Sequence, residues 1–418
     1  MRIAYLTSRY PAVSHTFILR EVQALRACGV EVITFSVRRA GAEDTLGPDA
    51  RQEAASTRWL VPPPGGELLR AVAWAWVTKP VLSARTLARA VLKRGTTLAQ
   101  RLKWLCYFGE AMLLAHRLTK QRCDHLHCHF GNSGSSTALL AAQLARIPFS
   151  LTCHGSELRS IHEYRLPEKV AQASFVACVS QHGKAQLMLA CPPRQWPKLH
   201  VVRCGVPAME PAPRDRGSGS AHILCVARLA PEKGHTVLLE ALADLRDRRV
   251  DFHCTLVGDG PLRPQIEERT RELQLTERMT LTGSLEPKRV AKLYATAHVL
   301  VLASLSEGVP VTLMEAMMHG CPVVATRVGG VPELVQDGRS GLVAEPGDPP
   351  ALADALHRVL INVELADTLA RNGNRLVRER FSTDKAASRL QELFTVAINA
   401  SPADQSCATK CHQTKPRP

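Results

Sequence analysis

The sequence lacks the features that mark membrane-spanning and secreted proteins. Across 418 residues, no window approaches the ~20 consecutive apolar residues that a membrane-spanning helix needs. Residues 1–7 have the length of a short strand and lead into polar residues, without the long apolar core and the small-residue cleavage site of a signal peptide. We therefore expect a cytoplasmic protein.

Motifs for metals and dinucleotides are also missing. The 13 cysteines are scattered, and neither the run His127-Cys128-His129 nor the cysteines near the C-terminus complete a four-ligand zinc pattern. Several cysteines, such as Cys153 and Cys225, lie in apolar strand-like runs, which is typical of buried free thiols in a reducing compartment. No Gly-x-Gly-x-x-Gly follows a predicted strand, which argues against a nicotinamide-dependent oxidoreductase.

Positive charge is in excess and is unevenly spread. The net charge is +15, and residues 64–122 hold eleven basic residues against only Glu67 and Glu110. The same segment contains five aromatic residues: Trp74, Trp76, Trp104, Tyr107 and Phe108. Basic residues mixed with Trp and Leu on helices fit a surface that rests on an anionic membrane, and they equally fit solvated helices with aromatic core residues. No nucleic-acid recognition motif accompanies the charge, so we expect no nucleic-acid partner.

The chain is too long for one core, and its apolar pattern predicts two domains. In both, strand-like runs alternate with helical segments, which predicts parallel sheets covered by helices. The strands expected in the first domain, residues 1–206, are 3–6, 30–35, 124–129, 149–153, 175–179 and 199–202. Those expected in the second domain, residues 221–380, are 222–227, 251–257, 279–283, 298–303, 322–326 and 341–344.

The remaining segments differ in composition from the two domains. Residues 207–220 are rich in Pro, Gly and charge and predict a linker. A last helix at residues 381–400 is expected to pack back on the first domain. The polar residues 401–418 are expected to form a disordered tail, and the basic segment at about residues 64–122 to form several helices.

The most informative stretch is residues 306–325. Between two apolar runs lie a short loop and a helix that we expect to begin at Pro310, since proline is favoured at the first helical position. Glu307 precedes this helix and Glu315 lies in it, at the carboxyl end of a predicted strand, where α/β sheets bind ligands. Backbone N–H groups there can hold a phosphate, and carboxylates can accept hydrogen bonds from a diol. The pair fits a sugar nucleotide, although two glutamates at this spacing also occur as solvated surface residues.

Two cations follow another predicted strand of the second domain. Arg228 and Lys233 come after residues 222–227, beside the opening of a helix. Both can meet a diphosphate, the arginine as a fork and the lysine as a point charge. Taken alone, two such cations are more often ordinary surface residues.

With Gly-Cys-Pro at residues 320–322 and Gly-Gly-Val-Pro-Glu at residues 329–333, the Glu-x7-Glu spacing resembles that of the family 4 retaining glycosyltransferases. The resemblance implies the GT-B architecture, in which two Rossmann-like, doubly wound α/β domains face each other across a cleft. It also implies retaining transfer of a hexose from a nucleotide diphosphate sugar. No cofactor and no metal are expected, because in this family paired cations neutralise the leaving diphosphate.

The same resemblance implies roles for individual residues. Arg228 and Lys233 would bind the diphosphate, Glu307 would bind hydroxyls of the transferred sugar, and Glu315 would bind the ribose diol. The other expected donor-site residues are glycines, backbone amides and a position near the base: Gly258, Gly283, Leu285, Gly308, Val309, Val311 and Thr312. Pro310 has no N–H, where many relatives carry glycine, so one backbone donor is missing.

The first domain resembles a narrower branch of the family. Most family 4 members have a Gly-Gly turn after the first strand, whereas this chain has no glycine before Gly29. Its Pro-x-x-Ser-x-Thr-Phe pattern at residues 11–17, followed by Arg-Glu, resembles the branch that builds colanic acid and other bacterial exopolysaccharides. That branch implies a lipid-linked oligosaccharide acceptor and a position on the inner face of the cytoplasmic membrane. Ser14, His15 and Thr16 would cap the following helix, bind ligand, or do both.

Three histidines are further candidates. His154-Gly155-Ser156-Glu157 follows the predicted strand 149–153 and resembles the family's His-Gly-x-Asp/Glu element, which implies that His154 lies at the donor sugar or the reacting centre. His127 and His129 share one face of the predicted strand 124–129. We expect a structural role for His127, and the role of His129 stays open between structure and the acceptor side.

Two rival functions remain at this point. A sugar-nucleotide epimerase or a phosphorylase could use the same fold. A basic scaffold protein at a membrane surface could use residues 64–122, but it would leave the arrangement of Arg228, Lys233, Glu307 and Glu315 unexplained.

Overall fold

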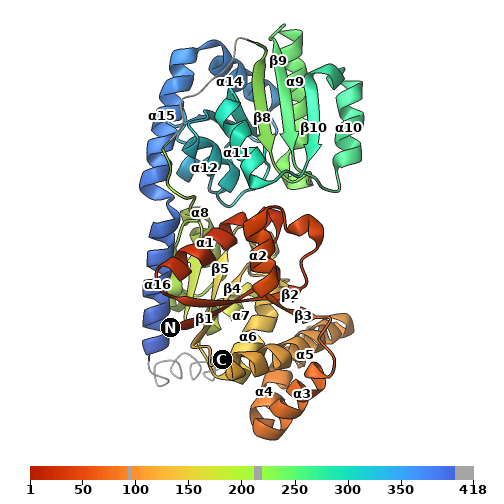
Figure 1. Cartoon of the computed structure of the whole chain (residues 1–418), viewed down its shortest axis with the longest axis vertical. Coiled ribbons are helices and arrows are strands. Elements are labelled where there is room, and N and C mark those ends of the chain that lie inside the picture. Colours follow the sequence, from red (N-terminus) through yellow and green to blue (C-terminus); the bar gives the residue numbers. More distant parts are fainter. Residues whose placement is uncertain (93–96, 211–218, 401–418) are drawn as a thin grey trace, which may run out of the picture.

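The computed structural model describes residues 1–92, 97–210 and 219–400. Two parallel sheets, each covered by helices, lie one above the other in Figure 1. Residues 211–218 of the expected linker and the expected disordered tail at 401–418 lie outside the described residues. Within the described ranges, no helix is long and apolar enough to cross a bilayer.

The first sheet has seven parallel strands in the order β3-β2-β1-β4-β5-β6-β7. They are β1 (Arg2–Arg9), β2 (Glu31–Arg38), β3 (Arg58–Val61), β4 (His125–His129), β5 (Phe149–Cys153), β6 (Phe175–Cys178) and β7 (Leu199–Val201). Six of these match the predicted strands within three residues at either end, because buried parallel strands read as continuous apolar runs. The sequence does not predict β3, an edge strand of four residues whose apolar pattern is too short to stand out.

Helices cover both faces of this sheet. On one face, α1 (Thr16–Ala27) and α16 (Thr383–Asn399) pack against each other over a core that contains Tyr5 and Phe394. On the other face, α6 (Ser133–Ala145) packs against α5 (Leu98–Lys120). The domain also contains the helices α2 (Pro48–Ser56), α7 (Leu166–Gln172) and α8 (Gln181–Ala190).

The basic segment folds into α5 and two shorter helices, α3 (Glu67–Thr78) and α4 (Pro80–Val91), which both pack on α5. Figure 1 shows α3 and α4 at the end of the molecule that lies farthest from the second domain. Four of the five aromatic residues in this segment are buried or partly buried in the core, as the solvated-helix alternative predicts: Trp74, Trp104, Tyr107 and Phe108. Trp76 is 39% exposed.

The second sheet has six parallel strands in the order β10-β9-β8-β11-β12-β13. They are β8 (Ala221–Val226), β9 (Phe252–Val257), β10 (Met279–Gly283), β11 (Val299–Leu302), β12 (Val323–Thr326) and β13 (Leu342–Ala344), all within one residue of the predicted bounds. The main helices packed on it are α9 (His235–Asp247), α11 (Pro287–Thr296), α12 (Val311–Met318) and α14 (Pro349–Ile361). The others in this domain are α10 (Arg263–Glu272), α13 (Val331–Leu334) and α15 (Val363–Arg380).

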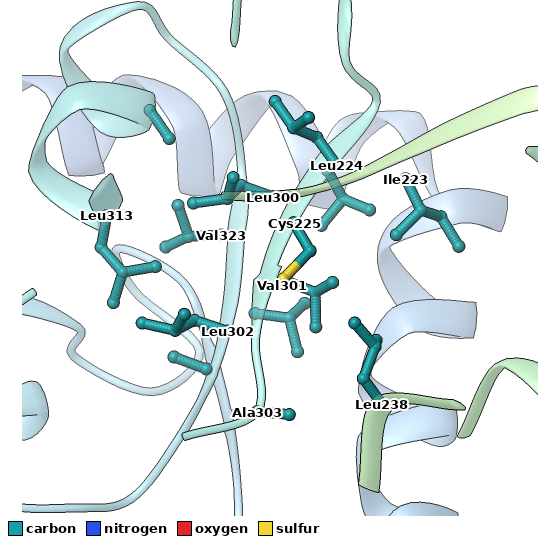
Figure 2. Packing of buried hydrophobic residues seen from close by; sticks show 14 of the residues in the cluster. Ile223, Leu224, Cys225, Leu238, Leu300, Val301, Leu302, Ala303, Leu313 and Val323 are labelled. Atoms are coloured by element: carbon teal, nitrogen blue, oxygen red, sulfur yellow. The ribbon is translucent and has the colours of Figure 1, made fainter. Parts of the chain in front are cut away.

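The core of the second domain holds α12 in place. Figure 2 shows Leu238 of α9 and Leu313 of α12 on either side of the apolar side chains of β8 and β11. Leu302 and Leu313 are at most 2% exposed. Because full burial of a leucine contributes about 1.5–3 kcal/mol, this packing anchors the helix that carries Glu315.

The end of the chain ties the two domains together. α15 packs on α12, and the chain then returns to the first domain as α16. At the crossing, the Val206 N–H donates to the Phe381 carbonyl at 2.9 Å and the Thr383 N–H donates to the Val206 carbonyl at 3.3 Å.

Candidate active site

The site lies where strand ends of the two domains meet. In the second domain, β11 ends at Leu302 and α12 begins at Val311. The expectation that Pro310 is the first helical residue is wrong by one position, because its ψ of 120° is extended rather than helical. The first turn of α12, with Val311 and Thr312, therefore holds N–H groups that the helix itself leaves unsatisfied.

Lys233 and Glu307 form an ion pair at two neighbouring strand ends. Lys233 Nζ lies 2.5 Å from Glu307 Oε1, and the Ser304 hydroxyl donates to the same oxygen at 2.7 Å. The Glu307 side chain is 9% exposed and that of Lys233 is 21% exposed. β8 and β11, which lead into these residues, are adjacent in the sheet. The structure thus brings together a cation and a carboxylate that the sequence separates by 74 positions.

Glu315 is held from both domains. Arg20 of α1 places a guanidinium nitrogen 2.6 Å from Glu315 Oε1, and the Tyr294 hydroxyl donates to Oε2 at 2.9 Å. The side chains of Arg20 and Glu315 are 22% and 18% exposed. Burial and the nearby Glu315 carboxylate raise the pKa of Tyr294 well above its ordinary value, so the hydroxyl keeps its proton. The carboxylate that we expect to bind a ribose thus also bridges the domains.

The two glycine-containing loops touch backbone to backbone across the domain boundary. A Cβ on Gly308 would lie 1.8 Å from the His154 carbonyl oxygen, and a Cβ on Gly155 would lie 2.9 Å from the Gly308 Cα. Within the second domain, a Cβ on Gly329 would lie 1.9 Å from the Glu307 carbonyl oxygen. No side chain fits at these contacts, so the glycines allow the His154 and Glu307 segments to approach directly.

His154 ends a hydrogen-bonded chain that begins in α1. Its Nε2 lies 3.0 Å from His129 Nδ1, and His129 Nε2 lies 3.1 Å from Glu21 Oε1. The Tyr5 hydroxyl donates to the same Glu21 oxygen at 2.8 Å. An ionised Glu21 can only accept, so the neutral form of His129 donates from Nε2 and accepts at Nδ1. With His129 in that form, His154 donates from Nε2.

Aromatic rings surround the His154 imidazole. The centroids of Phe17 and Phe130 lie 4.8 Å and 4.5 Å from that of His154. Burial, with a contribution from the neighbouring His129, lowers the pKa of His154 well below its ordinary value. The imidazole is therefore neutral at neutral pH and can exchange hydrogen bonds without carrying charge.

Glu157 shapes the loop that carries His154. Its side chain is buried, and Oε1 accepts hydrogen bonds from the N–H groups of His154 at 2.8 Å and Gly131 at 3.1 Å. Its second oxygen accepts from the Gly155 N–H at 3.1 Å. The acidic residue of the His-Gly-x-Glu element therefore organises the turn.

Both domains match known family profiles. A profile described as Glycosyltransferase Family 4 matches residues 14–209, and one described as Glycosyl transferases group 1 matches residues 220–362. MJ1178 of Methanocaldococcus jannaschii, which is named an uncharacterized glycosyltransferase, is 31% identical over 277 residues, which is 65% of this chain and 75% of that protein. The chain belongs to the family 4 glycosyltransferases.

Two further likenesses bear on this glycosyltransferase. The colanic acid biosynthesis glycosyltransferase WcaL of Escherichia coli is 28% identical over 375 residues, covering 85% of this chain and 90% of WcaL. The solved structure of Anabaena HepE in complex with UDP-glucose superposes with a TM-score of 0.74 at 18% identity, covering 94% of this chain and 99% of HepE. The second likeness shows the fold, so the GT-B architecture expected from the sequence is confirmed.

Arg228 is the most exposed of the charged residues expected at the donor site. Its guanidinium pairs with Glu232 at 2.6 Å, and its side chain is 57% exposed. Its backbone carbonyl lies 3.0 Å from His235 Nε2, which fixes the start of the loop. Its contact with a diphosphate stays a prediction.

The capping role expected for the first domain is wrong. α1 begins at Thr16 with His15 at the N-cap, and no side chain accepts a hydrogen bond from the helix N-terminus there. His15 Nδ1 instead lies 3.2 Å from the Arg9 carbonyl oxygen, and its ring centroid lies 4.9 Å from that of Phe130. Burial lowers the pKa of His15 to about 4. Ser14 is exposed, which leaves ligand binding as the remaining prediction for this segment.

Two of the expected donor-site glycines differ in their surroundings. The Gly258 N–H donates to the Gly283 carbonyl at 3.0 Å, and a Cβ at Gly258 would lie 2.0 Å from the Ala227 carbonyl oxygen. That contact alone requires glycine, and its amide is already used. Gly283 has a φ of +71°, and a Cβ there would lie 3.7 Å from a guanidinium nitrogen of Arg263, an ordinary contact distance. Leu285 packs partly buried against the core.

His127 has the surroundings of a structural residue. Its Nδ1 lies 2.7 Å from the Ser150 hydroxyl and its Nε2 lies 2.9 Å from the Thr152 hydroxyl. Ligand atoms of Glu21, His127 and His129 lie within 4.8 Å of one another. Both ring nitrogens of His127 already face hydroxyl partners. We therefore interpret these three residues as part of a hydrogen-bond network and not as a metal site.

The structure adds three residues that the sequence analysis did not single out: Arg20, Glu21 and Tyr294. Arg20 and Glu21 are the Arg-Glu pair that follows the Thr-Phe pattern in α1. Adjacent residues on a helix point in different directions, which lets Arg20 reach the second domain while Glu21 reaches His129.

Replacing Glu21 by Gln should lower kcat roughly tenfold and leave the KM for the donor unchanged, because glutamine can donate as well as accept and no longer sets the tautomers of His129 and His154. Steady-state kinetics with both substrates measures the split. The control is Glu364→Gln, on an exposed residue of α15. An unchanged kcat in a variant with lowered melting temperature would show that Glu21 serves stability alone.

Proposed function

We propose that this glycosyltransferase moves a hexose from a nucleotide diphosphate sugar to a growing glycan, with retention of configuration. The observation that carries the proposal is the Lys233–Glu307 pair beside the unsatisfied N–H groups at the start of α12. A cation and helix N–H groups suit a diphosphate, and a carboxylate suits sugar hydroxyls. HepE was solved with UDP-glucose, which supports the same class of donor for this chain.

The chemistry follows from the charges of these residues. Negative charge grows on the diphosphate as the glycosidic bond breaks, and Lys233, Arg228 and the start of α12 stabilise it. Glu307 and Glu315 bind the sugar and ribose hydroxyls. Neither glutamate is assigned as a nucleophile. Retention is therefore proposed to result from attack of the incoming hydroxyl on the same face of the sugar that the diphosphate leaves. The leaving phosphate accepts the proton of that hydroxyl. No metal is part of the proposal, since fixed cations supply the charge.

We infer that the acceptor is a lipid-linked oligosaccharide of an exopolysaccharide or cell-surface glycan. The name of WcaL, which assigns that protein to colanic acid biosynthesis, supports this inference. The acceptor would approach from the first domain, past Ser14, His15 and Thr16 and toward His154. Such a substrate would place the enzyme on the inner face of the cytoplasmic membrane.

A thermal-shift panel of UDP-, GDP- and ADP-hexoses tests the donor class. A ligand that binds only the folded protein stabilises it by about 2.7 kcal/mol at a free concentration of 100 times its Kd. We expect one nucleotide series to raise the melting temperature by several degrees. Glu315→Ala should remove most of that shift, because the ribose diol loses its acceptor. Glu364→Ala, on an exposed residue of α15 in the same domain, is the control.

The panel also gives the result that would contradict the proposal. If none of the three nucleotide series shifts the melting temperature, the donor site is wrong. If Glu315→Ala and Glu364→Ala respond alike to the effective nucleotide, the donor class stands but the assignment of Glu315 is wrong. A radiolabelled-hexose transfer assay with the effective donor then separates transfer from epimerisation.

A further inference from the structure

Exposed apolar side chains gather on one part of the first domain. Among the described residues, 17 large apolar side chains are exposed, and eight of them lie between Leu69 and Leu105, on or next to α3, α4 and α5. They are Leu69, Trp76, Val77, Val81, Leu92, Leu98, Leu102 and Leu105. Single exposed apolar residues are normal on a protein surface, but a gathering of this kind marks a surface that contacts an apolar partner.

The spacing places these residues on common helix faces. On α5, Leu98, Leu102 and Leu105 follow each other at intervals of four and three, and they are 83%, 62% and 47% exposed. On α3, Leu69 and Val77 are 76% and 79% exposed and lie eight positions apart, which is close to two turns. We call the part of the first domain formed by α3, α4 and α5 the projection. Its surface thus presents apolar ridges, in addition to the buried side chains that hold the three helices together.

Unpaired positive charge lies on the same helices as these ridges. Within the described part of the three helices, five cations have no hydrogen bond or ion pair to a described side chain: Arg70, Arg85, Arg89, Lys103 and, at the far end of α5, Lys120. The nearest acidic residue on α3, Glu67, is taken by Arg117 at 2.6 Å. Lys79 donates to the Leu144 carbonyl and lies over the Trp74 ring, so it belongs to the core side of the projection.

We propose that this projection, the exposed ridges of α3, α4 and α5 with their basic surround, docks on an anionic lipid bilayer. Aliphatic side chains enter the boundary between headgroups and acyl chains, and the arginines and lysine contact lipid phosphates. A second copy of the chain is a poor occupant, because two surfaces of the same positive sign would face each other. An acidic protein would match the positive charge but not the exposed apolar side chains.

The position of the projection determines which domain would lie next to the membrane. α3 and α4 lie at the end of the molecule opposite the second domain (Figure 1). The bilayer would therefore hold the first domain, while the second domain stays in solution with access to nucleotide sugar. The purpose of this docking rests on the proposed function, since a lipid-linked acceptor has to be met at a membrane, but the docking itself needs no donor.

Vesicle flotation of the full-length protein tests the proposal. We expect the protein to float with vesicles of phosphatidylcholine and phosphatidylglycerol and to remain behind with phosphatidylcholine alone. Binding should weaken at least tenfold when the ionic strength rises from ~0.1 M to ~1 M, because the Debye length falls from about 10 Å to about 3 Å. Absence of binding to the anionic vesicles would overturn the proposal.

Matched variants separate the apolar from the charged contribution. Leu98→Ser with Leu102→Ser, and separately Arg85→Ala with Arg89→Ala, should each weaken binding at least tenfold. Leu189→Ser, on a leucine of α8 that is 84% exposed, controls for the first change. Arg371→Ala with Arg375→Ala, a pair of exposed arginines on α15 with the same spacing, controls for the second. Equal losses in variants and controls would show that net charge or general hydrophobicity, and not this surface, causes the binding.

Two further measurements keep the outcomes distinct. Sedimentation velocity of the wild-type protein should show a monomer, and a dimer that Leu98→Ser with Leu102→Ser dissolves would assign the surface to a second copy instead. The nucleotide-induced thermal shift should be the same in all variants. Loss of flotation with an intact shift supports the docking surface, whereas an absent shift in the wild type concerns the donor site alone.

Discussion

Replacing Gly308 by alanine should reduce kcat/KM for transfer by about a hundredfold or more, which is the scale of loss for a misplacement near 1 Å. The added Cβ would lie 1.8 Å from the His154 carbonyl oxygen and 3.4 Å from Val179 Cγ2, both in the first domain. Backbone atoms cannot yield as a flexible side chain can, so the loops that carry His154 and Glu307 have to separate. The transferred sugar would then lose one side of its site.

The same substitution should weaken nucleotide binding much less than it weakens transfer. The atoms that the new Cβ meets belong to the first domain, whereas Lys233, Glu307 and Glu315 belong to the second. Transfer kinetics, nucleotide calorimetry and thermal melting together measure the split. Gly109→Ala is the control, because Gly109 lies inside α5 with nothing within 4 Å of its Cβ position. Wild-type transfer by the Gly308 variant would show that the domains do not meet at these loops during catalysis.

Replacing Lys233 by alanine should lower kcat by about a hundredfold to a thousandfold, the scale seen when one group that stabilises developing charge is removed. In the proposed reaction the ammonium group neutralises the leaving diphosphate. In the structure it also neutralises Glu307, whose side chain is 9% exposed. Removal of one partner of a buried ion pair is destabilising, so a loss of melting temperature should accompany the loss of activity.

A double-mutant cycle with Glu307→Gln separates these two roles of Lys233. The neutral glutamine no longer needs a cation, so the double variant should recover much of the melting temperature that Lys233→Ala loses. Its activity should not recover, because the diphosphate still lacks its cation. Lys292→Ala, on an exposed residue of α11, should match the wild type in both measurements. Recovery of activity together with stability would assign Lys233 a structural role only.

The ion pairs of the site also bear on how a donor enters. Arg20 already occupies one oxygen of Glu315, and Lys233 already occupies one oxygen of Glu307. A ribose or a hexose that binds these carboxylates has to share or displace those partners. Because Arg20 belongs to the first domain, nucleotide binding at Glu315 and the contact between the domains act on the same carboxylate.

The strands of both domains could be predicted because buried parallel strands have a simple signature. Runs such as Val299–Leu302 and Phe149–Cys153 are apolar or small along their whole length, since helices cover both faces of the sheet. The edge strand Arg58–Val61 escaped prediction because it is short and half-exposed. The capping role for Ser14–Thr16 failed because capping depends on side-chain direction, which residue type alone does not determine.

The candidate site could be predicted only in the parts that lie on one strand end or one helix. Glu307 and Glu315 were identified because both lie close to the start of one helix. Glu21 and Arg20 gave no separate signal, because their partners His129 and Glu315 lie 108 and 295 positions away in the chain. The basic aromatic segment was ambiguous for the same reason: helix spacing does not tell which face of α5 meets the core.

The sequence by itself determined the alternation of strands and helices, the two sheets, the family, and the acidic and basic residues at the strand ends of the second domain. These are properties of residues close together in the chain, and local spacing reports them. Only the tertiary structure decided which of these residues meet. It paired Lys233 with Glu307, set Gly308 against the backbone of His154, joined Glu21 to His154 through His129, and left three leucines at the start of α5 exposed. Such contacts depend on how whole domains pack, and no local pattern records that.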